Sequence, residues 1–224
     1  IIDHAVDQAL NEARSAAAWP AQSRLRALEA ARLRRLVREW LECERARDAF
    51  RVDATETARD VDIGGIRLSV RLDRVDLLRD GTRALIDYKT GAVARASWLG
   101  PRPDEPQLPL YFATADEPVT ALVFARVKRG IDMGFTGYGV LAGNVPGVIP
   151  IESDTRRRGP AYASWDELGA EWESSTATLA SDLASCGPRL NPKQGAQTCA
   201  TCDLQGLCRI GAGAVTDDSQ TDTV

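Results

Sequence analysis

The sequence predicts an α/β (α+β) domain in which helices flank one central mixed β-sheet. Three observations support this fold class. Apolar and charged residues alternate over residues 66–72, as in a half-buried strand. Apolar residues recur at helical spacing through the first 47 residues. The elements also succeed one another as two helices, three strands, a helix, two strands and a helix, an order that favours a sheet covered by helices.

Each element has its own signal in the sequence. Pro20 ends the first helix, and the Asp80-Gly81 pair turns the chain between two strands. Ser164 and Glu167 form a capping box for the last long helix. In chain order we expect helices over 1–18 and 23–47, strands over 50–58, 66–72 and 84–89, a helix over 105–115, strands over 119–128 and 133–141, and a helix ending near 185.

The composition is that of a folded domain. The 224 residues are 44% hydrophobic and 27% charged, with neither an apolar run of membrane-spanning length nor a signal peptide. We expect one domain over 1–210, with a cysteine-rich segment over 186–210 and a small, polar, disordered tail over 211–224. The missing initiator Met predicts a piece of a longer protein, and the cysteine usage favours the cytoplasm.

Positive charge is clustered although the formal net charge is −4. Arginines crowd residues 24–51, and smaller clusters occupy 126–129 and 156–158. They are explained either by a local basic track for nucleic acid or by solvated helix faces whose charge glutamates such as Glu29 and Glu39 balance. For any single cluster we favour the second explanation.

The sharpest chemistry lies in two neighbouring predicted strands. Asp87 and Lys89 are two residues apart, so both point to the same side of the sheet, and Asp73 lies on the adjacent strand. An ion pair alone would explain Asp87 and Lys89. It does not explain a second aspartate, because converging carboxylates repel unless a cation neutralises them. Mg²⁺ or Mn²⁺ accepts such oxygen ligands, and Lys89 would add a positive charge at a phosphate under attack.

Strand register tests this site. A two-residue turn at Asp80-Gly81 would place Asp73 opposite Tyr88, on the wrong face for Asp87. A three-residue loop over 80–82, or a bulge near Asp73, restores the shared face. The apolar alternation changes phase just beyond Asp73, so we expect a register break here.

Three motifs in this order resemble the RecB-type branch of the PD-(D/E)XK nuclease superfamily. Residues 71–76 are similar to its GxxDRxD motif, with Arg71 in place of glycine, residues 87–91 match DYKTG, and residues 107–111 match QxxxY. The resemblance implies a restriction-endonuclease-like core and a Mg²⁺-dependent deoxyribonuclease. The catalytic residues that it implies are Asp73, Asp87, Lys89, Gln107 and Tyr111, with Asp73, Asp87 and the Tyr88 carbonyl as metal ligands. Taken alone, Gln107 and Tyr111 would be ordinary packing residues.

The same resemblance implies roles for two earlier residues. His4 matches a helical histidine that serves the RecB-type branch as an additional metal ligand, although a lone histidine is more often a packed or surface residue. Glu56 matches an early glutamate near the first strand, and an ion pair at the strand edge would explain it almost as well.

Cys199, Cys202 and Cys208 form a second motif. Three thiolates on one loop indicate a soft metal or a cluster. The spacing resembles the C-terminal iron–sulfur motif of AddB-type nucleases, which implies a 4Fe–4S cluster that ties the two ends of the domain together. We expect its fourth cysteine upstream of Ile1. The alternative is a structural zinc completed by Cys43 or Cys186.

The predicted function is a metal-dependent DNA nuclease of DNA repair or recombination, acting as an exonuclease on single-stranded or unwound ends. Its partners would be DNA and a helicase region or subunit. One alternative is a catalytically inactive DNA-binding module of a helicase–nuclease complex, although such modules are expected to lose one of the three residues Asp73, Asp87 and Lys89. The other is a zinc-stabilised interaction domain, which only the cysteines support.

Overall fold

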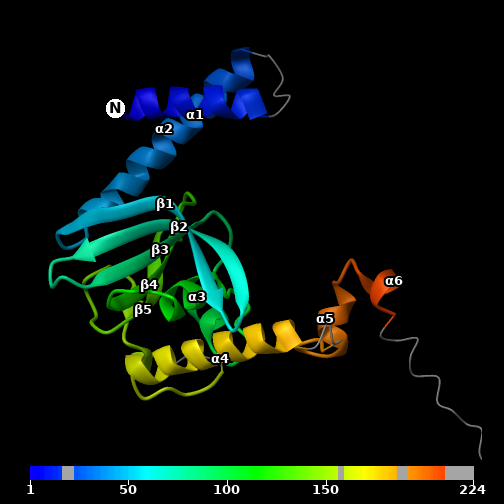
Figure 1. Cartoon of the computed structure of the whole chain (residues 1–224). Coiled ribbons are helices and arrows are strands. Elements are labelled where there is room, and N and C mark those ends of the chain that lie inside the picture. The colour runs from blue at the N-terminus through cyan, green and yellow to red at the C-terminus, as the bar shows by residue number, and fades with distance from the viewer. Residues whose placement is uncertain (17–22, 156–158, 186–190, 210–224) are drawn as a thin grey trace, which may run out of the picture.

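A computed structural model describes residues 1–16, 23–155, 159–185 and 191–209. Its centre is one six-stranded sheet in the order β1-β2-β3-β4-β5-β6 (Figure 1). The β3–β4 and β5–β6 pairs are parallel and the other neighbours are antiparallel. The strands are β1 (Phe50–Ile63), β2 (Ile66–Leu78), β3 (Arg83–Lys89), β4 (Val119–Arg126), β5 (Gly134–Gly139) and β6 (Val148–Ile149). The predicted mixed sheet with flanking helices is confirmed.

Helices cover both faces of this sheet. The helices are α1 (Ile2–Ala16), α2 (Ser23–Arg45), α3 (Gln107–Ala113), α4 (Trp165–Ser185), α5 (Ala196–Ala200) and α6 (Gln205–Cys208), with 3-10 turns at Arg95–Trp98 and Ile151–Ser153. Leu108 of α3 and Trp172 of α4 pack with Leu85 and Leu122 on one face. Trp40, near the end of α2, packs on the other face. None of the described helices is long and apolar enough to cross a membrane.

Burial on both faces explains the central strands. Residues 84–86 of β3 and 121–125 of β4 are buried without interruption, which is why they are apolar throughout instead of alternating. Alternate residues of β3 therefore belong to different cores: Leu85 faces α3 and α4, whereas Ala84 and Ile86 face α2. By the same alternation Asp87 and Lys89 lie on the side of α3 and α4.

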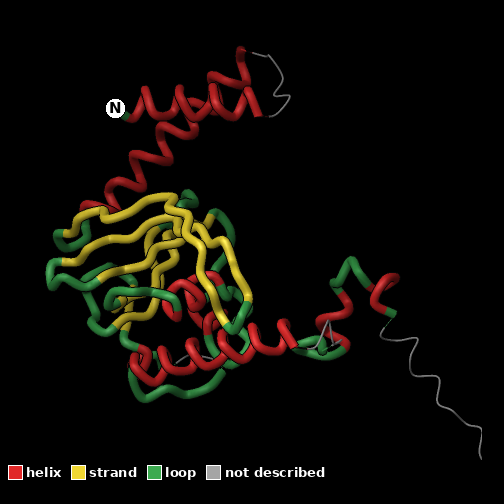
Figure 2. The backbone as a smooth tube through the Cα atoms, viewed as in Figure 1, coloured by secondary structure: helices red, strands yellow, loops and turns green. Residues whose placement is uncertain are grey.

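The first two strands are longer than predicted. β1 and β2 run to Ile63 and from Ile66 around Gly64 and Gly65, whose φ angles are 57° and 83°. Positive φ at both central residues is what a tight two-residue hairpin requires. The hairpin extends toward α4 (Figure 2), where Gly64 lies close to Ala180.

The remaining predicted boundaries shift by a few residues. The helix predicted over 105–115 spans Gln107–Ala113, and β6 was not predicted. The capping box is present, since the Glu167 amide donates to Ser164 Oγ at 3.1 Å and the Glu167 carboxylate accepts from the Ala163 amide. The cysteine-rich segment holds the short helices α5 and α6. The predicted tail over 211–224 lies outside the described residues.

Candidate active site

The β2–β3 hairpin places Asp73 level with Asp87. The Leu78 amide donates to the Thr82 carbonyl at 2.8 Å, so residues 79–81 form a three-residue loop. The last of them, Gly81, has a φ of 83°. The ladder pairs Arg74 with Ile86 and shows no shift of its own. Continued by one residue, it sets Asp73 opposite Asp87 and on the same face. The loop is therefore one residue earlier than the predicted 80–82, and no β2–β3 bulge is needed.

The sheet is nevertheless irregular at Asp73. Instead of main-chain pairing, the Asp73 carboxylate accepts a hydrogen bond from the Tyr88 amide at 2.9 Å. On the other side, the paired residues of β1 and β2 skip Glu56 and Asp73, and Glu56 has a φ of 52°. The Glu56 side chain forms an exposed ion pair with Arg71 at 2.6 Å. Glu56 thus occupies the strand-edge ion pair that was its alternative interpretation.

Asp87 and Lys89 form the centre of the constellation. Asp87 Oδ2 lies 3.0 Å from Lys89 Nζ, with the two side chains 5% and 27% exposed. This oxygen is buried, yet no donor meets it in regular hydrogen-bond geometry. Burial raises the pKa of Asp87, and the charges of Asp73 and Glu105 act in the same direction against the opposing effect of Lys89. The carboxylate consequently retains unused capacity to accept a cation.

A third acid, Glu105, was not predicted. Its Oε2 lies 3.6 Å from Lys89 Nζ, and it comes from the segment just before α3. Burial lowers the pKa of Lys89, but the close approach and charge of Asp87, together with Glu105, outweigh burial and raise that pKa overall. Lys89 therefore remains an ammonium at neutral pH.

Gln107 and Tyr111 support the strand that carries Asp73. Tyr111 is buried, and its hydroxyl accepts from the Arg71 amide at 3.1 Å and donates to the Arg71 carbonyl. Gln107 donates to the same hydroxyl at 3.3 Å. The pair thus fixes β2 two residues before Asp73.

Beneath the site, the opposite face of the sheet holds a buried charge network. Arg74 donates to Asp76 at 2.7 Å, to Glu44 of α2 at 2.7 Å and to the Tyr88 hydroxyl at 2.8 Å. Arg47 pairs with Asp76 at 2.7 Å and with Glu44 at 2.9 Å. Two arginines and two carboxylates balance one another here, so the network joins α2 to β2 and β3 without net charge.

The structure does not bring His4 to this constellation. His4 is exposed on α1, whose ion pairs join Asp3 and Asp7 to Arg34 of α2. In Figure 1, α1 lies apart from the sheet. Among residues 1–16, 23–155, 159–185 and 191–209, no group of three or more His, Cys, Asp or Glu side chains is arranged to hold a metal ion.

Nor does the described part of the chain show a metal-holding arrangement of Cys199, Cys202 and Cys208. They are partly buried free thiols, but in the described segment they do not converge as cluster ligands. Cys43 is a free thiol on α2 that contacts the Glu39 carbonyl, and Cys186 lies outside the described residues. The described residues therefore do not support the predicted 4Fe–4S cluster, which stays a prediction.

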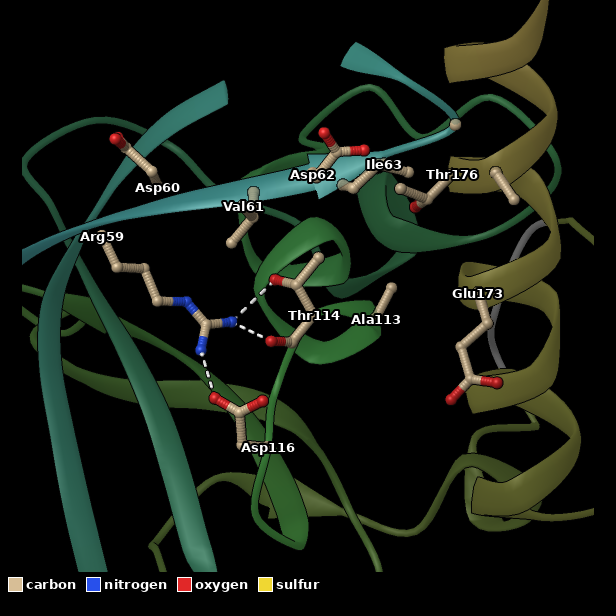
Figure 3. Close-up of a pocket in the computed structure, with 12 residues that line it drawn as sticks. Arg59, Asp60, Val61, Asp62, Ile63, Ala113, Thr114, Asp116, Glu173 and Thr176 are labelled. Carbon is tan, nitrogen blue, oxygen red and sulfur yellow. Dashed lines mark hydrogen bonds and ion pairs between the residues drawn. The ribbon is translucent and has the colours of Figure 1, made fainter. Parts of the chain in front are cut away.

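A prominent hollow lies elsewhere. A pocket of about 520 Å³ opens between β1, the end of α3 and α4 (Figure 3), and Asp73, Asp87 and Lys89 do not line it. Arg59 crosses it, donating to Thr114 Oγ1 at 2.8 Å and pairing with Asp116 at 3.2 Å. The carboxylate–lysine constellation and this pocket are therefore separate parts of the molecule.

The residues around Asp87 do fit a hard divalent cation. Two carboxylates lie on one face of neighbouring strands, and the buried Oδ2 of Asp87 is approached by Lys89 Nζ without regular hydrogen-bond geometry. Asp87 lies within the electrostatic influence of Asp73 and Glu105, and among the described residues Lys89 is the one cation that acts on it, so the site carries an excess of negative charge that a divalent cation would neutralise. Asp73 and Asp87 would hold that cation.

One of two comparisons with known proteins supports this interpretation of the site. No curated protein matches the chain. The model of the PD-(D/E)XK nuclease superfamily matches residues 1–209, and enzymes of this superfamily typically use a divalent metal to hydrolyse nucleic acid. Because the match spans both strands of the site and almost the whole length, the chain belongs to the PD-(D/E)XK nuclease superfamily.

Proposed function

We propose that this chain is a Mg²⁺- or Mn²⁺-dependent deoxyribonuclease that degrades single-stranded or unwound DNA ends as an exonuclease, in DNA repair or recombination. The observation that supports an active enzyme is the approach of Asp73 and Asp87 beside Lys89. Asp73 and Asp87 would hold the cation with carboxylate oxygens and Tyr88 with its carbonyl oxygen. His4 would join them only if α1 closed onto the sheet.

The chain's own groups have separate tasks in this reaction. A cation held by these residues would supply Lewis acidity for the scissile phosphate and would make an attacking water more acidic. Lys89, whose raised pKa keeps it charged, offers an ammonium to the phosphate oxygens as negative charge develops there. Tyr111 and Gln107 hold β2 so that Asp73 keeps its place opposite Asp87.

The test is Mg²⁺-dependent degradation of end-labelled single-stranded DNA. We expect Asp87→Ala and Lys89→Ala each to lower the rate by about 10²-fold or more. The control of unchanged rate is Glu152→Gln, at an exposed residue of a 3-10 turn. Equal activity in both variants would trace the cleavage to a contaminant. Binding of DNA without any cleavage would favour the non-catalytic module.

The partner and cluster predictions need their own measurements. A helicase region or subunit remains a proposed partner, to be identified by co-purification with the full-length protein. The nuclease proposal does not depend on the three cysteines, and visible absorption of anaerobically purified protein would distinguish an iron–sulfur cluster from colourless zinc.

A further inference from the structure

Lys89 lies between two carboxylates that come from different parts of the fold. Its Nζ is 3.0 Å from Asp87 Oδ2 on its own strand and 3.6 Å from Glu105 Oε2. The backbone fixes the segment that carries Glu105, since the amides of Asp104 and Glu105 donate to the Ser97 carbonyl at 2.8 and 3.2 Å. The second carboxylate is therefore held near the ammonium independently of the sheet.

The two partners of Lys89 differ in what else they can bind. Asp87 is 5% exposed and shares its face with Asp73, so the same carboxylate would hold both the ammonium and a divalent cation. Two cations on one carboxylate repel each other. Glu105 is 46% exposed and, among the described residues, its ion pair is with Lys89, so it remains available to the ammonium when Asp87 binds the cation.

We propose that Glu105 is a positioning residue that retains the Lys89 ammonium at the site while a divalent cation occupies Asp87. This inference rests on the proposed function in one respect, namely that the cation binds at Asp87. The Lys89 ammonium and the divalent cation compete for the Asp87 carboxylate. Glu105 attracts the ammonium away from Asp87 and so favours binding of the cation. Without Glu105, the Lys89 ammonium would have only Asp87 as its ion-pair partner and would compete more strongly with the divalent cation for that carboxylate.

The experiment is a double-mutant cycle on Mn²⁺ affinity, measured by calorimetry on the whole chain without DNA. We expect Glu105→Gln to weaken Mn²⁺ binding about fivefold or more when Lys89 is present. In a Lys89→Met background, the same substitution should weaken binding about twofold or less, because only the direct attraction of Glu105 for the cation is lost. Equal losses in both backgrounds would overturn the proposal, since Glu105 would then act on the cation without Lys89.

Two controls make the outcome specific. Glu117→Gln removes a more exposed glutamate that pairs with Arg83 at 3.3 Å, away from Lys89, and should leave Mn²⁺ affinity unchanged. Glu105→Asp keeps the charge and should recover part of the affinity that Glu105→Gln loses; no recovery would count against a charge-based role. Failure of the proposed function looks different: Asp87→Asn would then bind Mn²⁺ as tightly as the wild type.

Discussion

At the residue scale, Asp87 belongs to the candidate site but lowers the free energy of unfolding at neutral pH. Burial raises its pKa, so the folded state binds this proton more tightly than the unfolded state does. The contribution of Asp87 to the free energy of unfolding therefore decreases as the pH rises through that raised pKa. At neutral pH the ionised side chain destabilises the fold relative to an uncharged isostere.

We accordingly expect Asp87→Asn to raise the melting temperature at pH 7 in metal-free buffer, by roughly 2–4 °C for each kcal/mol relieved. At a pH below the ordinary pKa range of aspartate, the side chain at position 87 is neutral in the wild type and in the variant, and the difference in melting temperature should vanish. Calorimetry at the two pH values measures this. Addition of Mn²⁺ should raise the melting temperature of the wild type but not of the variant. A less stable variant at pH 7 would mean that the Lys89 ion pair outweighs the burial of Asp87.

Tyr111 acts on the site through the backbone of β2. Its hydroxyl is bonded to both the amide and the carbonyl of Arg71, two residues before Asp73. Tyr111→Phe should lower the free energy of unfolding by about 1–2 kcal/mol and should also weaken Mn²⁺ binding. The matched control is Tyr162→Phe, which removes a buried hydroxyl bonded to the Gly100 amide at 3.0 Å. It should cost similar stability and leave Mn²⁺ binding unchanged, whereas equal effects on binding would contradict a positioning role for Tyr111.

At the scale of elements, the buried network decides how α2 is attached to the sheet. Arg74 and Asp76 of β2 meet Glu44 and Arg47, which lie at and just beyond the end of α2. Asp76 and Arg47 have fully buried side chains. Removing one charge would leave an uncompensated charge in a region that water does not reach.

Asp76→Asn should therefore destabilise the protein by about 3–5 kcal/mol, measured by urea unfolding. Its control is Glu42→Gln, which breaks the exposed Glu42–Arg45 pair and should cost no more than about 1 kcal/mol. If the two variants lose similar stability, the network is not what attaches α2 to the sheet.

The elements that sequence patterns predicted well are those whose signal is local. Alternation located the start of β2, and Ser164 with Glu167 located the start of α4. In this hairpin the strand over 66–72 was predicted, but the end of β1, residues 59–63, was missed although Val61 and Ile63 alternate with the exposed Asp60 and Asp62 and Gly64-Gly65 is a turn signal. Patterns that depend on local spacing could not show that segments distant in sequence meet in space.

The same limit applied to the site. Asp73, Asp87 and Lys89 could be chosen from one hairpin, because strand periodicity decides which residues share a face. Glu105 approaches Lys89 from a segment whose position depends on the packing of α3, and Glu44 meets Arg74 across thirty residues of chain. No spacing rule connects these pairs.

At the scale of the whole molecule, arginines of α2 hold α1 in place. Arg34 pairs with Asp3 at 2.8 Å and with Asp7 at 2.9 Å, and Arg26 donates to Asn11 at 2.8 Å, so three residues of α1 are bound to α2. Val6 and Leu10 add a small apolar cluster between the two helices. α1 is therefore fastened to the part of α2 that lies away from the sheet (Figure 1), and His4 is carried with it.

This arrangement makes the role of His4 depend on the state of the molecule. As a ligand it must reach Asp73 and Asp87, which requires α1 to close onto the sheet, and bound DNA is the partner expected to favour that closure. We therefore expect His4→Ala to leave Mn²⁺ affinity unchanged, within about twofold, in the free protein. With a cleavage-resistant phosphorothioate single strand present, the same substitution should weaken Mn²⁺ binding about tenfold, or 1.4 kcal/mol. A loss of Mn²⁺ affinity already present without DNA would show that α1 closes onto the sheet unaided. No loss in either state would exclude His4 from the site, and the cation would then be held by Asp73, Asp87 and the Tyr88 carbonyl.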